Sequence, residues 1–222
     1  MLSPDPNSST PGIQLLGDLH LLTERLGSPA ASGDAVAATT GFLSVTNAAQ
    51  LRDFLLQYRR ELLEPIELPA IQRAFFHASR HQTRELIAFD QELGEPPMAR
   101  ELASASRRVG RAQLKRLHPL RDQRLVRRYL AAVESGKAYG WHTLVYGIGL
   151  HLYSLPLREG LVAYAHQTIS QFIASAAPSL QMDEASAEEL LLGTTATLPR
   201  SVEEALAGFP GGALARAPQL CG

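Results

Sequence analysis

A glycine stands in the middle of a strongly helix-forming run of this sequence. The run extends from Ala105 to Leu117, reads ASRRVGRAQLKRL, and holds Gly110 near its centre. Glycine destabilises a helix interior by about 1 kcal/mol relative to alanine, so we predict that another backbone approaches this helix closely at Gly110. Arg111 follows the glycine, and Ser106 precedes it by four residues, or about one helical turn.

Apolar residues recur at helical spacing along most of the chain, and no stretch alternates for long enough to predict a strand. The clearest helix is Thr46–Leu63, for which Asn47 and Gln50 supply a capping pair. Further helices are expected over residues 13–26, 34–43, 68–79, 83–93, 98–117, 121–133, 141–153, 155–177, 186–192 and 201–207. The sequence therefore predicts an all-α fold, a single-domain irregular bundle of about ten helices.

Prolines are expected to mark the ends of helices. Pro65 should separate the helix that ends at Leu63 from the next one, and Pro178 should end the long helix before it. Ser154 is the expected cap of that long helix, with Pro156 in its first turn, where proline is tolerated.

The length of 222 residues fits one domain with terminal tails. We predict a disordered leader over residues 1–12, a helical domain over 13–207 and a loose tail over 208–222. The single cysteine excludes an internal disulfide framework, and no apolar run approaches the roughly 20 residues of a membrane span. With a net charge of −1 as well, the expectation is a cytoplasmic protein without nucleic-acid or membrane partners.

The segment Arg100–Arg128 is strongly basic, with ten basic residues against two acidic ones, a net charge of +8. A solvated helix face is the favoured interpretation, and a docking face for an acidic protein is the second. Nucleic acid comes third, because only Tyr129 supplies a nearby aromatic ring for base stacking.

Histidines offer weak candidates for metal ligands. His77 and His81 lie four residues apart, a spacing that can direct two imidazoles at one metal ion, and Cys221 could add a thiolate. No further ligand completes either motif, so we predict no metal site. His142 and His151 share one predicted helix and are expected to lie on the same side of it, packed or hydrogen-bonded.

Motifs of catalysis are missing from the sequence. It contains no G-x-S-x-G elbow, no phosphate-binding P-loop, no dinucleotide-binding glycine pattern after a strand, and no H-E-x-x-H pair. The segment Tyr139–Gly149 instead places three glycines near one apolar helix, together with Trp141 and Tyr146. This composition indicates a tightly packed central helix, which is compatible with a helix that supports a protein interface.

Four segments carry motifs that occur together in one known family. They are VTNAAQLRDFL at 45–55, the S-x-x-x-G-R pattern of Ser106, Gly110 and Arg111, the G-x-H-x-x-V-x-G pattern at 140–147 with His142 and Gly147, and the helix 155–177 with Tyr164. In this order the segments resemble the UreF family of urease accessory proteins, over residues 34–207. The chain departs from the family in its N-terminal motif, at Pro178 and Ser179 where the family carries a basic residue, and in the C-terminal tail.

The resemblance implies a helical homodimer that is not an enzyme. Such a protein sits on the accessory protein UreH (UreD), receives the GTPase UreG, and helps to hand nickel to apo-urease. No tightly bound cofactor is implied, because the nickel is handled by the complex. The residues expected at interfaces are Arg111, Ser106, Gly110, His142, Gly147 and Tyr164.

Two other interpretations stay open at this point. One is a helical enzyme or small-molecule-binding protein whose pocket uses the histidines and Tyr146. The other is a chaperone that binds nickel directly through His77, His81 or Cys221.

Overall fold

The computed structural model describes residues 45–94, 100–117 and 124–207, with side chains from residue 103 onward in the middle range. Every regular element in these ranges is a helix, which confirms the predicted all-α fold. The predicted leader, the tail and the helices expected over 13–26 and 34–43 lie outside the described residues.

The first described helices form one continuous run. Helix α3 (Ala48–Tyr58) begins at Asn47, whose side chain accepts a hydrogen bond from the Gln50 N–H at 2.9 Å. The Gln50 side chain accepts in return from the Thr46 N–H at 2.8 Å, so the predicted capping pair is confirmed. The π-helix η1 (Arg59–Glu67) and helix α4 (Leu68–Ser79) continue directly from α3.

Pro65 does not break this run, and the prediction that it would is wrong. It lies inside η1, where the wider turn of a π-helix gives the proline ring room that an α-helix lacks. Within the described residues the chain stays helical from Ala48 to Ser79, so the two helices predicted on either side of Pro65 form one run and the helix count differs slightly from the ten or so expected.

The remaining elements complete the bundle. They are α5 (Thr83–Glu92), α6 (Arg100–Leu117), α7 (Arg124–Glu134), α8 (His142–Leu152), α9 (Leu157–Leu180), α10 (Glu184–Thr195) and α11 (Leu198–Ala207). Helices α10 and α11 both begin before the predicted positions, and the Asp183 side chain caps α10 by accepting from the Ser186 N–H at 2.8 Å.

The predicted ends of α9 are also corrected. Ser154 has a positive φ of 54° and does not cap the helix. The helix begins at Leu157, and the residue before it, Pro156, has an extended backbone conformation. Pro178 lies within the last turn, and the helix ends at Gln181, whose φ of 52° is left-handed. Proline removes one backbone donor from the helix, and only two helical residues, Ser179 and Leu180, follow Pro178 before α9 ends.

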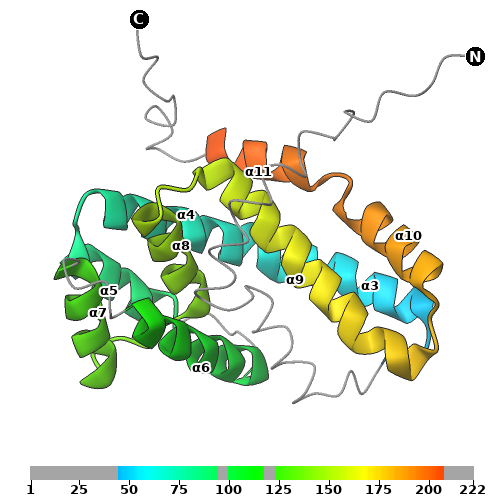
Figure 1. Ribbon diagram of the computed structural model, residues 1–222, viewed down its shortest axis with the longest axis horizontal. Coiled ribbons are helices and arrows are strands. Elements are labelled where there is room, and N and C mark those ends of the chain that lie inside the picture. Colours follow the sequence, from blue (N-terminus) through cyan, green and yellow to red (C-terminus); the bar gives the residue numbers. More distant parts are fainter. Residues whose placement is uncertain (1–44, 95–99, 118–123, 208–222) are drawn as a thin grey trace, which may run out of the picture.

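Helix α8 is the centre of the bundle, and its residues 142–150 are all buried. It packs mainly against α4 and α6. Figure 1 shows α5, α6 and α7 gathered at one end of the molecule, while α10 and α11 lie along the other side, beyond the long diagonal of α9. Across the residues that the structure describes, no helix combines the length and the apolar character needed to cross a membrane.

Candidate functional site

Helix α6 crosses the chain where α8 begins, and Gly110 lies at the crossing. A Cβ atom added to Gly110 would lie 2.1 Å from the carbonyl oxygen of Gly140 and 2.6 Å from the backbone nitrogen of His142. Both distances are far inside van der Waals contact, and both neighbours are backbone atoms. The close backbone approach predicted at Gly110 is therefore confirmed, and this crossing is called the α6–α8 junction below.

Two polar side chains of α6 tie the junction together. Trp141, the residue before α8, provides no side-chain cap, and the Ser106 hydroxyl instead accepts a hydrogen bond from the His142 N–H at 3.3 Å. The imidazole of His142 is fully buried, and its Nδ1 is hydrogen-bonded at 2.8 Å to the side-chain oxygen of Gln113. A buried polar group stays stable only with such a partner, so Ser106 and Gln113 fix both the start of α8 and the orientation of His142.

Asp90 of α5 holds the chain segment that leads into the junction. Its fully buried carboxylate accepts hydrogen bonds from the Tyr129 hydroxyl, from the Tyr139 N–H and, at 3.0 Å, from the Gly140 N–H. Its backbone carbonyl accepts from the indole N–H of Trp141 at 2.8 Å. Gly140 has a φ of +73°, a conformation that glycine adopts without strain. Asp90 thus fixes the turn that Gly110 contacts.

Two arginines of α6 cover the outer side of the same turn. The exposed Arg111 donates from Nε to the Tyr139 carbonyl oxygen at 3.2 Å. The guanidinium of Arg107 lies over the rings of Tyr139 and Trp141, 5.6 and 5.4 Å from their centres. Since a cation over an aromatic ring is stabilised by the ring's electron-rich face, both arginines contribute to the junction.

A cluster of aromatic rings extends from His142 into the core. The ring of Tyr164 on α9 lies 5.7 Å from that of His142 and 5.1 Å from that of Tyr146, measured between centres. The carboxylate of Glu67 accepts hydrogen bonds from the hydroxyls of Tyr58 and Tyr164, at 2.6 and 3.2 Å. Burial raises the pKa of Glu67 to about 7, although these two hydrogen bonds favour the charged form.

This raised pKa predicts a pH-dependent stability. A carboxyl group with a pKa near 4.5 when unfolded and about 7 when folded binds its proton more tightly in the native state. Glu67 should therefore lower the free energy of unfolding progressively as pH rises between these values, by on the order of 2 kcal/mol. Glu67→Gln keeps an acceptor for both tyrosines and should remove this loss.

Urea unfolding of both proteins between about pH 5 and about pH 8 would measure the effect. The burial of His151 and His166 lowers their pKa values and makes stability fall toward acid pH in both proteins. The difference in the free energy of unfolding between wild type and Glu67→Gln at each pH isolates the contribution of Glu67. Parallel pH profiles would show that Glu67 does not titrate in this way.

Gly147 lies on a different side of α8 and faces α4. A Cβ atom there would lie 2.4 Å from the Ile71 carbonyl oxygen and 3.0 Å from the Ala74 Cβ. The expectation that His142 and His151 share one side of α8 is wrong. Nine residues correspond to two and a half helical turns at about 3.6 residues per turn, so the two rings point to opposite sides. His151 packs against Phe75 of α4 instead.

The weak metal candidates do not form a ligand pair on one helix. His77 is within α4 and its Nδ1 is hydrogen-bonded to the Gln82 side-chain oxygen at 3.0 Å, whereas His81 lies beyond the helix with a φ of 54°. In the part of the chain that the structure describes, no three histidine, cysteine, aspartate or glutamate side chains gather as they would around a metal ion. Cys221 lies outside the described residues.

The structure thus brings together five of the six residues expected at interfaces. Ser106, Gly110, Arg111 and His142 meet at the α6–α8 junction, and Tyr164 packs on His142; Gly147 belongs to the α4–α8 contact. Of the six, Arg111 alone is exposed, and the other five contribute to the packing of the helices. Their role in partner binding stays a prediction.

Sequence reasoning missed the polar residues that complete the junction. Asp90, Gln113 and Glu67 were not singled out, although Asp90 carries one signal: it lies four residues after Leu86 and next to Phe89, on the apolar face of its helix. A charged residue on an apolar face indicates a buried hydrogen-bond acceptor. The sequence cannot show which donors it meets.

The fold and the junction define an all-helical protein in which the buried side chains of Asp90, Gln113 and His142 link helices that are distant in sequence. The family model of UreF matches residues 45–194, about two-thirds of the chain. The chain belongs to the UreF family, a family of urease accessory proteins, as its motifs predicted. No curated protein matches the chain.

Proposed function

We propose that this protein is a urease maturation factor that works as a helical adaptor. It recruits the GTPase UreG and the accessory protein UreH/UreD in the cytoplasm, as a homodimer, and the assembly inserts nickel into apo-urease. The observation that carries the proposal is the UreF match over residues 45–194, which includes all of the α6–α8 junction. Nickel is the cargo of the complex, and the adaptor itself holds no tight cofactor.

An adaptor of this kind acts through binding free energy. It holds the GTPase next to the metal-carrying partner, and it favours one nucleotide state of the GTPase only to the extent that it binds that state more tightly. The packing of α8 between α4 and α6 supports this role, because a rigid core keeps two binding surfaces at a fixed separation.

Co-purification tests the proposal directly. The tagged full-length chain is mixed with UreG and UreH/UreD, singly and together, and we expect at least the three-protein mixture to yield a stable complex. Retention of neither protein, alone or together, would refute the adaptor role and leave the family assignment standing. Multi-angle light scattering of the chain alone tests the homodimer.

Arg111 provides a more local prediction. Arg111→Glu reverses the one exposed charge of the junction and loses the hydrogen bond to the Tyr139 carbonyl, so we expect about fivefold to tenfold weaker complex formation, or roughly 1 kcal/mol. Arg52→Glu on the exposed face of α3 is the matched control, with the same change of charge. Equal complex yields for wild type and both variants would remove Arg111 from the candidate contacts.

A further inference from the structure

Helices α6 and α7 carry a dense set of positive charges, most of them on exposed side chains. Their described cations are Arg107, Arg108, Arg111, Lys115 and Arg116 on α6, and Arg124, Arg127 and Arg128 on α7. The two helices pack against each other, and over residues 103–117 and 124–134 the only acidic side chain is Glu134. None of these cations forms an ion pair with an acidic group that the structure describes. The set is called the basic face below.

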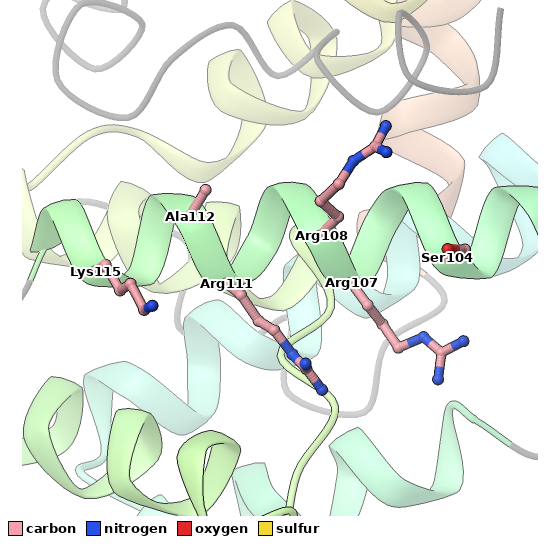
Figure 2. A pocket seen from close by; sticks show the side chains of 6 residues that line it. All are labelled: Ser104, Arg107, Arg108, Arg111, Ala112 and Lys115. Atoms are coloured by element: carbon pink, nitrogen blue, oxygen red, sulfur yellow. The ribbon is translucent and has the colours of Figure 1, made fainter. Parts of the chain in front are cut away.

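The basic face is hollowed rather than flat. An open depression of about 540 Å³ lies along α6, lined by Ser104, Arg107, Arg108, Arg111, Ala112 and Lys115 among the described residues. Figure 2 shows Arg107, Arg111 and Lys115 extending from the same side of α6, with Arg108 on the other. A second depression of about 350 Å³ lies against Arg124, Arg127, Arg128 and Ala131 of α7.

The spacing of these positive charges destabilises helix α6 in the isolated chain. Arg107, Arg111 and Lys115 follow one another at intervals of four residues, and like charges at this spacing destabilise a helix by about 0.2–0.5 kcal/mol per pair. The sequence outside 100–128 carries a net charge of −9. Its acidic helices α10 and α11 lie far from α6 and α7 in Figure 1, so they do not neutralise the basic face within one chain. A bound anionic surface would relieve the repulsion.

The chemistry of the basic face favours carboxylates over nucleic acid. Seven of its eight described cations are arginines, whose planar guanidinium groups bind carboxylates through two parallel hydrogen bonds. Few aromatic rings lie beside it: Trp141 is buried, and Tyr139, which is exposed, already has Arg107 over its ring, so the described residues offer no row of rings on which bases could stack. A whole chain of net charge −1 also lacks the long-range attraction that polyanions require.

We propose that the basic face of α6 and α7 is the docking surface for an acidic, carboxylate-rich surface of a partner protein. This inference rests on the proposed function, which supplies the partners to be tested: UreG, UreH/UreD and their complex. The exposed cations of the face steer the encounter with the partner, and the two depressions along α6 and α7 fix the orientation in which it binds.

A triple charge reversal tests the docking surface. Arg108→Glu, Lys115→Glu and Arg128→Glu change three exposed side chains that have no hydrogen bond or ion pair with the described residues, and they spare Arg107 and Arg111, which hold the junction. We expect affinity for the partner to fall at least about tenfold at low salt. Wild-type affinity should also fall by about tenfold or more between about 50 and about 500 mM NaCl, with a much weaker salt dependence in the variant.

The matched control is the triple variant Arg52→Glu, Arg60→Glu and Arg200→Glu. It has the same change in net charge on exposed positions of α3, η1 and α11, where Arg60 and Arg200 form only exposed ion pairs of little energetic value. We expect less than about a twofold change in affinity for it. Circular dichroism and thermal unfolding should show both triple variants folded as in wild type.

The outcomes separate this inference from the proposed function. If wild type binds none of the partners, the proposed function and the docking surface both fail. If wild type binds and the α6–α7 variant binds equally well, or both triple variants weaken equally, only the docking surface is refuted. If the α6–α7 variant instead loses self-association at unchanged partner affinity, the face binds a second copy of this chain and the inference is likewise overturned.

Discussion

Gly110→Ala is expected to lower the free energy of unfolding by about 3 kcal/mol, although alanine is the better helix former. The added methyl group would lie 2.1 Å from the Gly140 carbonyl oxygen and 2.6 Å from the His142 nitrogen, and neither backbone atom can move aside as a flexible side chain could. Helix α6 would have to move away from α8. This movement would also lengthen the hydrogen bond from His142 to Ser106.

Gly193→Ala is the matched control for this prediction. Gly193 also lies inside a helix, α10, but a Cβ atom there meets, among the described residues and beyond the adjacent backbone of its own helix, no atom within 4 Å. Alanine at this position should stabilise the protein by up to about 1 kcal/mol through helix propensity alone. Urea unfolding monitored by circular dichroism measures both variants. Similar effects of the two substitutions would show that the α6–α8 junction tolerates a side chain, contrary to the structure.

Asp90→Ala is expected to be at least as damaging, with a loss of about 3–5 kcal/mol. The substitution leaves three donors without their acceptor: the Tyr129 hydroxyl and the N–H groups of Tyr139 and Gly140. These hydrogen bonds are buried or partly buried, and leaving a buried donor without a partner costs more free energy than the hydrogen bond contributes. Because the Tyr139–Trp141 segment would lose its anchor, partner binding through Arg111 should weaken as well.

Two variants make the Asp90 prediction specific. Tyr129→Phe removes one of the three donors and leaves the carboxylate in place, so it should cost about 1–2 kcal/mol. Asp53→Ala removes an exposed carboxylate on α3 and should change stability by less than about 0.5 kcal/mol. If Asp90→Ala costs no more than Asp53→Ala in chemical unfolding, Asp90 does not organise the segment as described.

The predictions from sequence succeeded where the physical cause is local. The all-α fold followed from helical spacing, and the cap at Asn47 and Gln50 followed from residues three positions apart. The close approach at Gly110 followed from the cost of glycine in a helix. Pro65 was misjudged because the usual rule assumes α-helical geometry, whereas the chain changes to a π-helix there.

The amino-acid sequence alone determined that the chain forms helices, that Gly110 meets another backbone, and that its motifs belong to the UreF family. Only the tertiary structure decided which groups meet: Gly110 with the Gly140 carbonyl, Asp90 with donors up to 50 residues away, and Glu67 with two tyrosines from different helices. The physical reason is one of range. Helix propensity and capping act over about four residues of chain, whereas buried hydrogen bonds join groups that become neighbours only when the helices pack.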